Sequence, residues 1–185
     1  RVLFRSLELC PGDVVLLRGA SGSGKSSLLR CIVGLEQPNA GRILWQGDEI
    51  HGHRFLTFRD RVRYVQQRPT RIGQTVGQDL AFARRIARSH APDTSGLEAL
   101  QRERLADLGL DGIDWSRDFD ALSVGEQQRV ALVRCLTSEP DILLLDEPTS
   151  SLDSTRVAHV EDLLMDYLRA DEARRALLWV THQQA

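Results

Sequence analysis

A phosphate-loop pattern constrains this chain more than any other feature of its sequence. Residues 19–27 read GASGSGKSS and fit GxxxxGK[ST], a loop whose backbone N–H groups surround nucleotide phosphates. The apolar residues before it are typical of a buried parallel strand, and residues 27–33 have the apolar spacing of a helix that ends at Gly34. This order of strand, loop and helix favours phosphate binding over a serine–glycine turn that fits the pattern by chance.

Each residue type in the loop suits a phosphate site. The unpaired N–H groups and the dipole at the start of a helix attract an anion. Lys25 is the only lysine in the chain, and an ammonium is not interchangeable with a guanidinium at such a site. Ser26 offers a hydroxyl to Mg²⁺. The candidate nucleotide-binding residues of the loop are Gly19, Ser21, Gly22, Ser23, Gly24, Lys25, Ser26 and Ser27.

Composition narrows the class of protein. A length of 185 residues predicts one domain with a substantial core, and 42% hydrophobic with 27% charged residues is typical of a soluble globular protein. A net charge of -2 argues against a general affinity for nucleic acid. Three cysteines without metal-type spacing fit reduced thiols in the cytosol. Because the chain begins with Arg1 rather than methionine, we expect a fragment.

The spacing of apolar residues predicts the remaining elements. Strand patterns occupy residues 2–9, 42–46, 61–66, 142–145 and 177–180. Helical patterns begin near residues 75, 97, 124 and 154. Thr75 and Gln78 resemble a capping box at the first of these helices.

Two acidic residues end the apolar run at residues 142–145. A carboxylate at the carboxyl end of a parallel strand, beside a phosphate loop, is in place to bind Mg²⁺, and Asp146 is the candidate. Glu147 could orient or deprotonate a water for in-line attack on a γ-phosphate. An acidic pair alone could simply face solvent, but the phosphate loop in the same chain favours the catalytic interpretation.

Residues 122–129 read LSVGEQQR, and with them the chain resembles the nucleotide-binding subunit of an ABC transporter. The signature of that family is LSGGQ followed by a Q-R pair, upstream of Walker B. Its other elements have counterparts in the same order: the Q-loop glutamine Gln67, Walker B at 142–147, the D-loop at 148–153 and the switch-histidine segment at 179–182. Residues 64–80 and 178–182 are also similar to small bacterial subunits for iron or metal export.

The resemblance implies an α/β fold with a P-loop NTPase core and a mainly parallel sheet. It also implies an N-terminal antiparallel β part and a helical subdomain at about residues 75–137 that carries the signature, within one ABC-type domain at 1–185. The implied cofactors are ATP and Mg²⁺. The implied partners are a second copy in a homodimer and an integral membrane permease, with no nucleic acid. The chain is then expected to be cytoplasmic, peripheral on the inner face of the cell membrane.

The family also implies roles for single residues. Ser123 and Gly125 contact the γ-phosphate held by the other subunit, so that two ATP lie in a head-to-tail dimer, and Asp153 joins the cofactor-binding set. The implied catalytic residues are Glu147, His182 and Gln67, and the implied metal-binding residues are Ser26, Gln67 and Asp146. Val124 and Glu126 depart from the signature, but Ser123 and Gly125 are intact, so an active site is expected. The aromatic residue that stacks on adenine is expected upstream of Arg1, and Phe4 is expected to pack in its strand.

Other functions fit the sequence less well. A soluble ABC-type ATPase that acts on nucleic acid or ribosomes is the main alternative, but no coiled-coil or zinc-bearing insertion lies between Lys25 and Leu122, and there is no tandem domain. A kinase or GTPase leaves the signature unexplained. The cargo and the direction of transport depend on the permease. The family's permease-docking groove corresponds to residues 67–76, where Arg71 and Ile72 either form a docking surface or pack within their own subdomain.

Overall fold

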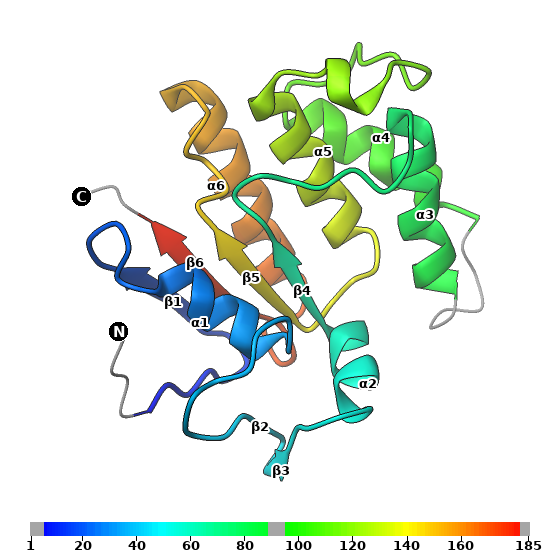
Figure 1. The fold of residues 1–185 in the computed structure, drawn as a ribbon. Helices are drawn as coiled ribbons and strands as arrows, with labels where there is room; N and C mark the ends of the chain where they lie inside the picture. The colour runs from blue at the N-terminus through cyan, green and yellow to red at the C-terminus, as the bar shows by residue number, and fades with distance from the viewer. Residues whose placement is uncertain (1–5, 89–94, 182–185) are drawn as a thin grey trace. The chain divides into compact units, whose positions relative to one another are not determined.

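The computed structural model describes residues 6–88 and 95–181 (Figure 1). The chain forms two compact units, each considered by itself. The first contains the described residues of Arg1–Tyr64, Pro140–Glu147 and Glu172–Ala185, and the second contains those of Val65–Glu139 and Pro148–Asp171. Among the described helices, none has the length and apolar character to cross a membrane.

Strands and helices alternate along most of the chain (Figure 1). The strands are β1 (Val14–Arg18), β2 (Leu44–Trp45), β3 (Asp48–Glu49), β4 (Val62–Val65), β5 (Ile142–Asp146) and β6 (Ala176–Thr181). The helices are α1 (Lys25–Ile32), α2 (Arg54–Arg61), α3 (Val76–Arg88), α4 (Leu97–Asp107), the 3₁₀ turn η1 (Phe119–Ala121), α5 (Val124–Leu136) and α6 (Ser154–Arg169).

A four-stranded sheet with the order β1-β6-β5-β4 organises the first unit. Strand β6 pairs in parallel with both β1 and β5, so Trp179 lies opposite Leu16 on one side and Leu145 on the other. The carboxyl ends of β1 and β5 therefore meet at one edge of the sheet. This edge holds both the phosphate loop that follows β1 and the acidic pair that ends β5.

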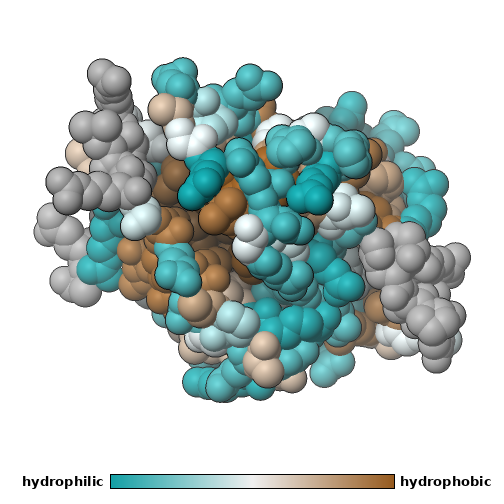
Figure 2. Space-filling view, turned by 90° about the horizontal axis from the view of Figure 1, so that it is seen from below, coloured by the Kyte–Doolittle hydropathy of each residue, from teal (hydrophilic) through white to brown (hydrophobic). Residues whose placement is uncertain are grey.

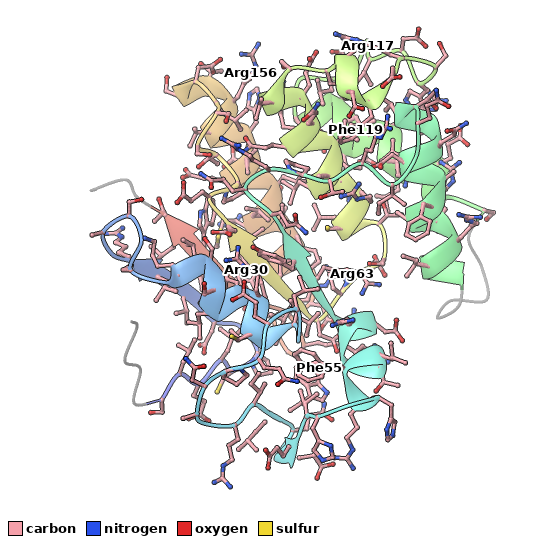
Figure 3. The ribbon with its side chains drawn as sticks, in the orientation of Figure 1. Arg30, Phe55, Arg63, Arg117, Phe119 and Arg156 are labelled. Carbon is pink, nitrogen blue, oxygen red and sulfur yellow. The ribbon has the colours of Figure 1, made fainter. Side chains whose placement is uncertain are left out.

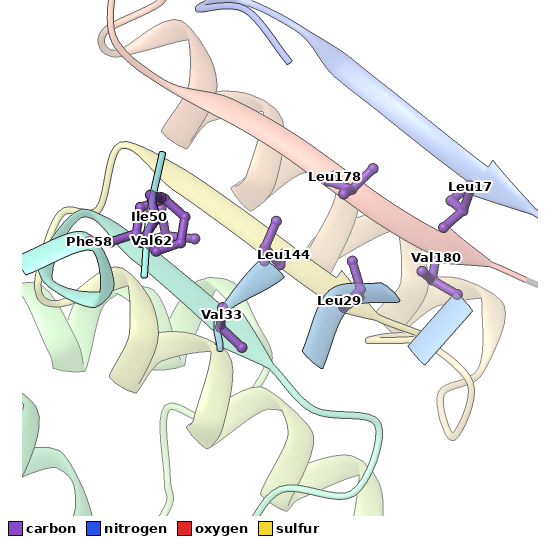
Figure 4. Packing of buried hydrophobic residues seen from close by; sticks show 9 residues of the cluster. All are labelled: Leu17, Leu29, Val33, Ile50, Phe58, Val62, Leu144, Leu178 and Val180. Atoms are coloured by element: carbon purple, nitrogen blue, oxygen red, sulfur yellow. The ribbon is translucent and has the colours of Figure 1, made fainter. Parts of the chain in front are cut away.

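The core of the first unit lies between α1 and one face of this sheet (Figure 4). Leu29 of α1 and Val180 of β6 are fully buried, and the exposed fraction of Leu144 of β5 is 1%. Each buried side chain of this size contributes roughly 1.5–3 kcal/mol of hydrophobic free energy. The cluster consists of Leu17, Leu29, Val33, Ile50, Phe58, Val62, Leu144, Leu178 and Val180. Packing of α1 against this face fixes the helix that carries the phosphate loop.

Helix α2 is an element that the apolar spacing did not predict. Four of its eight residues are charged, and it is too short to show a helical period. Tertiary contacts hold it instead: Phe58 makes an edge-on contact with Trp45, with ring centroids 5.4 Å apart. The Arg59 guanidinium donates to the carbonyl oxygens of Val33 at 2.7 Å and Gly34 at 2.9 Å. Carbonyl groups at the C-terminal end of a helix lack a partner within the helix. Arg59 of α2 therefore caps α1, the helix of the phosphate loop, at its C-terminal end.

Helices α3, α4 and α5 pack against one another in the second unit. Val76 and Leu80 of α3 are fully buried, and so is Val133 of α5. Gln101 of α4 is also fully buried, and its amide donates to the carbonyl oxygen of Leu80 at 3.0 Å. Arg84 of α3 donates to the side-chain oxygen of the same Gln101 at 2.7 Å, so polar contacts join the two helices beside the apolar ones.

The structure corrects one prediction of a strand and one of a helix cap. Residues 6–10 of the described chain lie in no strand, so the predicted strand at 2–9 is wrong there. The expected antiparallel β part is present as β2 with β3, where Trp45 lies opposite Asp48. Only half of the predicted capping box forms: the Thr75 hydroxyl accepts from the Gln78 N–H, but the Gln78 side chain accepts from the Gln74 N–H.

Hydrophilic residues cover most of the face shown in Figure 2, and an apolar area lies among them. Large hydrophobic side chains that are exposed in the described part of the chain are Leu7, Val14, Leu16, Leu35, Leu44, Leu56, Ile72 and Val124. Single exposed apolar residues are common on soluble domains, so each needs its own argument before a role is assigned.

Candidate active site

The phosphate loop leaves β1 and enters α1 through two glycines with left-handed backbones. Gly22 has φ 75° and Gly24, the N-cap of α1, has φ 91°. Residues with a Cβ rarely adopt these angles, which explains the glycines in the pattern. Gly24 supplies no side-chain cap to α1. The first N–H groups of this helix are therefore available to an anion.

Lys25 is only 6% exposed, although lysine side chains are almost always exposed. Its ammonium donates to the carbonyl oxygens of Gly19 at 2.7 Å and Ala20 at 2.9 Å. A third contact, 3.5 Å long, reaches the Ser23 hydroxyl. The loop thus folds around its own lysine, which concentrates positive charge beside the first turn of α1.

Asp146 connects the phosphate loop to the end of β5. The Ser26 hydroxyl donates to Asp146 Oδ1 at 2.9 Å, although the two residues are 120 positions apart in the sequence. The Tyr64 hydroxyl, from β4, donates to Asp146 Oδ2 at 2.8 Å. Asp146 itself is 3% exposed. Both oxygens of this buried carboxylate therefore have a hydroxyl partner.

Tyr64 was not among the residues that the sequence analysis selected for the site. Burial raises the pKa of its phenol well above the ordinary value, and the hydrogen bond to Asp146 raises it further. The guanidinium of Arg30, which projects from α1 (Figure 3), acts in the opposite direction on this pKa. The phenol consequently stays protonated at neutral pH and acts as the donor in its bond to Asp146.

Glu147 follows Asp146 with an unusual backbone. Its φ is 51°, in the left-handed region that glycine prefers. Its N–H donates to the carbonyl oxygen of Val180 at 3.1 Å, so the turn is fixed to β6. The side chain is half-buried. A strained residue of this kind persists where the surrounding structure holds it, and such residues cluster at active sites.

The oxygen donors of the first unit fit a magnesium ion. The Ser26 hydroxyl and the Asp146 carboxylate are hard ligands, and they already lie within hydrogen-bond distance of each other. Among the described residues, no three His, Cys, Asp or Glu side chains form a metal cluster. Mg²⁺ commonly binds through one or two protein ligands together with substrate phosphates, so this small donor set is sufficient. Gln67, the third predicted ligand, belongs to the second unit.

The predicted signature residues lie at the start of α5 in the second unit. Ser123 is the N-cap, and its hydroxyl accepts from the Glu126 N–H at 3.3 Å. The Glu126 carboxylate accepts from the Ser123 N–H at 2.7 Å and from its hydroxyl at 2.8 Å. These two bonds, the backbone one first, lower the Glu126 pKa below its ordinary value. A Cβ at Gly125 would lie 2.9 Å from the Leu152 side chain and 3.1 Å from the Ser151 carbonyl oxygen, so a larger residue there would force its neighbours to shift.

Gln128 links three predicted motifs inside the second unit. Its side-chain amide donates to the carbonyl oxygen of Gln67 at 2.9 Å and lies 3.5 Å from the Ser150 hydroxyl. It thus joins the Q-loop, the signature helix and the segment after Walker B. Asp153 is the N-cap of α6 and accepts from the Arg156 N–H at 2.9 Å. Gln128 was not selected from the sequence either, because a contact across 61 positions leaves no local pattern.

One predicted catalytic residue, His182, lies outside the described residues, as does Phe4. The chain is described up to Thr181, the last residue of β6. The described part of the site therefore falls into two sets. Lys25, Ser26, Asp146 and Glu147 come together in the first unit, and Gln67, Ser123, Gly125 and Asp153 belong to the second.

Comparison with known proteins decides the family. The sequence profile of the ABC transporter family matches residues 5–150. The chain belongs to the ABC transporter family. As an ABC-type ATPase domain, it binds and hydrolyses ATP. The resemblance seen in the signature, Walker and Q-loop segments is thereby confirmed.

Relatives within the ABC family include both exporters and importers. The chain is 37% identical over 180 residues to the "Probable iron export ATP-binding protein FetA" of Escherichia coli (strain K12), covering 97% of this chain and 76% of that protein. It is 38% identical over 186 residues to the sulfate/thiosulfate import ATP-binding protein CysA of Pseudomonas aeruginosa, covering 97% and 54%. The chain thus spans about half the length of CysA.

A solved ABC structure shares the fold. It is a dimeric ATP-binding cassette in a post-hydrolysis state with ADP and phosphate bound. The TM-score is 0.80 at 28% identity, and the match covers 96% of this chain and 78% of that one. The α/β fold with its mainly parallel sheet and separate antiparallel pair is therefore that of ABC ATPases.

Proposed function

We propose that this ABC ATPase domain works as one of two identical subunits that pair head to tail around two ATP and drive transport through a membrane permease. The observation that carries the proposal is the 2.9 Å hydrogen bond from Ser26 to Asp146. It joins the phosphate loop to the strand-end carboxylate, which are the two parts that a nucleoside triphosphate with its metal needs on one subunit. The subunit is then peripheral on the cytoplasmic face of the membrane.

The residues of the first unit have complementary roles in hydrolysis. Lys25 and the N–H groups at the start of α1 bind the β- and γ-phosphates. Ser26 and Asp146 hold Mg²⁺, which neutralises phosphate charge when bound, and the family resemblance adds Gln67 to this set. Glu147 takes a proton from the attacking water while the bond between the γ-phosphorus and the β–γ bridging oxygen breaks, giving ADP and phosphate. His182 and Gln67 orient this water.

The second unit completes the site of a partner copy. Ser123 and Gly125 stand at the N-terminus of α5, where N–H groups and the helix dipole favour an anion. In the proposed dimer they face the γ-phosphate that the other copy holds, and Asp153 lies near the same contact. The dimeric arrangement of the similar ATP-binding cassette supports this assembly.

The permease docks on the surface around Ile72 in the same proposal. Ile72 is 49% exposed, yet its N–H donates to Asp79 Oδ1 at 2.7 Å, so its backbone is fixed while its side chain faces outward. Asp79 is fully buried and pairs with Arg134 at 2.7 Å. Beside Ile72 lies a pocket of about 480 Å³, lined by Ile72, Gly73, Gln78, Ala81, Phe82, Arg84 and Arg85. An apolar anchor with arginines around it suits a short permease helix that carries acidic residues.

Mixing two inactive mutants tests the shared site. Lys25→Ala disables the phosphate loop and Ser123→Arg disables the signature, so each mutant alone forms only defective sites. In a mixed dimer, one composite site has both defects and the other has neither. We expect each mutant alone to lose ATP hydrolysis and the mixture to recover part of it, measured by phosphate release. Full activity of either mutant, or of a strictly monomeric sample, contradicts the head-to-tail assembly.

A further inference from the structure

The carboxylate of Asp146 needs outside partners to keep one orientation. The last torsion of an Asp side chain is soft, with a broad and roughly two-fold profile, so packing alone does not fix the plane of the carboxylate. Here the plane is fixed by two hydroxyls, Ser26 on Oδ1 at 2.9 Å and Tyr64 on Oδ2 at 2.8 Å. The first comes from the phosphate loop and the second from β4, the strand next to β5 in the sheet.

The two hydroxyls have different relations to the nucleotide. Ser26 belongs to the loop that binds phosphate and is itself a candidate ligand of the metal. Tyr64 is half-buried on a strand of the sheet, and its bond bridges 82 positions of sequence. The Tyr64 bond therefore occupies Oδ2 and leaves Oδ1, beside Ser26, as the oxygen that would be available to a metal ion.

We propose that Tyr64 is the positioning residue that aims the Asp146 carboxylate at Mg²⁺ and so sets how tightly the site holds the metal–nucleotide complex. The inference rests on the proposed placement of Mg²⁺ between Ser26 and Asp146. Groups that orient a metal-binding side chain from behind typically contribute 10–100-fold to metal affinity or activity. Tyr64 acts through Asp146 and contacts neither phosphate nor water in the reaction.

The test measures how Mg²⁺ changes nucleotide affinity when the hydroxyl of residue 64 is removed. Tyr64→Phe keeps the ring and removes the oxygen, and Tyr167→Phe on α6 is a matched control, since the chain has two tyrosines. Each is placed in the full chain with Glu147→Gln, so that hydrolysis does not disturb equilibrium. A fluorescent ATP analogue is titrated in EDTA and at rising Mg²⁺, and direct Mn²⁺ binding is measured by electron paramagnetic resonance.

We expect Tyr64→Phe to match the parent in EDTA and to need about 10–100-fold more Mg²⁺ to reach half of the maximal affinity gain, with Mn²⁺ binding weakened by a similar factor. Tyr167→Phe should keep the Mg²⁺ midpoint and the Mn²⁺ affinity of the parent. An unchanged Mg²⁺ midpoint overturns the inference. An equal loss of affinity in EDTA and in Mg²⁺ also overturns it, since Tyr64 would then support only the fold.

Asp146→Asn separates this inference from the proposed function. If it abolishes the Mg²⁺ dependence while Tyr64→Phe leaves the dependence unchanged, Asp146 stays a metal ligand and only the role of Tyr64 is withdrawn. If Asp146→Asn itself leaves the Mg²⁺ dependence unchanged, the metal site assigned to Ser26 and Asp146 is wrong, and the Tyr64 inference falls with it.

Discussion

At the scale of single residues, Glu147 combines a strained backbone with a proposed chemical role. Its φ of 51° costs free energy that a residue in a relaxed conformation avoids, of the order of 1–3 kcal/mol. The neighbouring Asp146 ends the strand, and the N–H of Glu147 is tied to Val180. The turn therefore ends the regular strand geometry of β5 at Asp146.

Glu147→Gln should separate binding from hydrolysis. Gln has the same backbone restriction as Glu, so the mutant should unfold at nearly the same temperature as the parent. Loss of the base should lower steady ATP turnover by roughly 10²–10⁴-fold while ATP binding persists. The measurements are phosphate release, nucleotide binding and thermal unfolding on the same samples. Near-normal hydrolysis by the mutant removes Glu147 from the role of base.

At the scale of elements, the start of α5 shows how a departure from the family signature is accommodated. Glu126 replaces the signature glutamine and completes a capping box with Ser123, in which each side chain accepts from the other's backbone N–H. Arg117 lies 3.6 Å from the Glu126 carboxylate and partly neutralises it. Glu126 therefore keeps a capping interaction at this position and stabilises the helix that presents Ser123.

Glu126→Ala should destabilise the protein by about 1 kcal/mol at pH 7, as expected for loss of a helix cap. Because the Ser123 N–H lowers the Glu126 pKa in the folded state, the unfolded chain binds the proton more readily. The carboxylate therefore stabilises the fold above about pH 4.3, and this contribution is lost as pH falls through the lower folded pKa.

Urea unfolding of the parent and of Glu126→Ala across pH 3–7 measures this contribution, with exposed Glu103→Ala on α4 as the control. The difference between parent and Glu126→Ala should shrink toward low pH, and Glu103→Ala should stay close to the parent. A difference that grows on acidification would show that the carboxylate does not stabilise the cap.

At the scale of the whole molecule, the proposed functions divide between two units. Lys25, Ser26, Asp146 and Glu147 belong to the unit with the sheet, whereas Gln67, the signature and the docking surface belong to the unit with α3, α4 and α5. Ile72 is the residue that tests this division most directly, since it is apolar, half-exposed and held by its backbone.

Ile72→Asp should leave the isolated subunit intact and weaken its attachment to the permease. The side chain is exposed, so thermal stability and ATP hydrolysis should stay near those of the parent. Pull-down of the permease that copurifies with the full-length protein should fall, and transport with it. Leu56→Asp on α2, also exposed, is the control that should keep permease binding. Joint loss of stability and hydrolysis in Ile72→Asp would place Ile72 in the core and withdraw the docking assignment.

Local sequence patterns predicted those parts of the molecule whose structure depends on residues close together in the sequence. The phosphate loop, β5 with its acidic end, and the start of α5 all follow from patterns within a few residues of one another. The Ser123–Glu126 cap was not predicted, although its S-x-x-E spacing is a local signal that could have revealed it. Tyr64 was not predicted, because its partner lies 82 positions away. Helix α2 was not predicted either, because it depends on contacts such as that of Phe58 with Trp45, and its own residues show no helical period.

The order of strands in the sheet has a consequence for how the protein is made. Strand β1 is synthesised well before its one neighbour in the described sheet, β6, which follows about 160 residues later. At synthesis rates of 5–20 residues per second, β1 waits roughly 10–30 s for this partner. During that time the apolar edge of β1 is open to wrong pairing. Among the described strands, β1, which precedes the phosphate loop, therefore waits longest for the strand that it pairs with. Binding of ATP can stabilise the fold only after β6 has been synthesised.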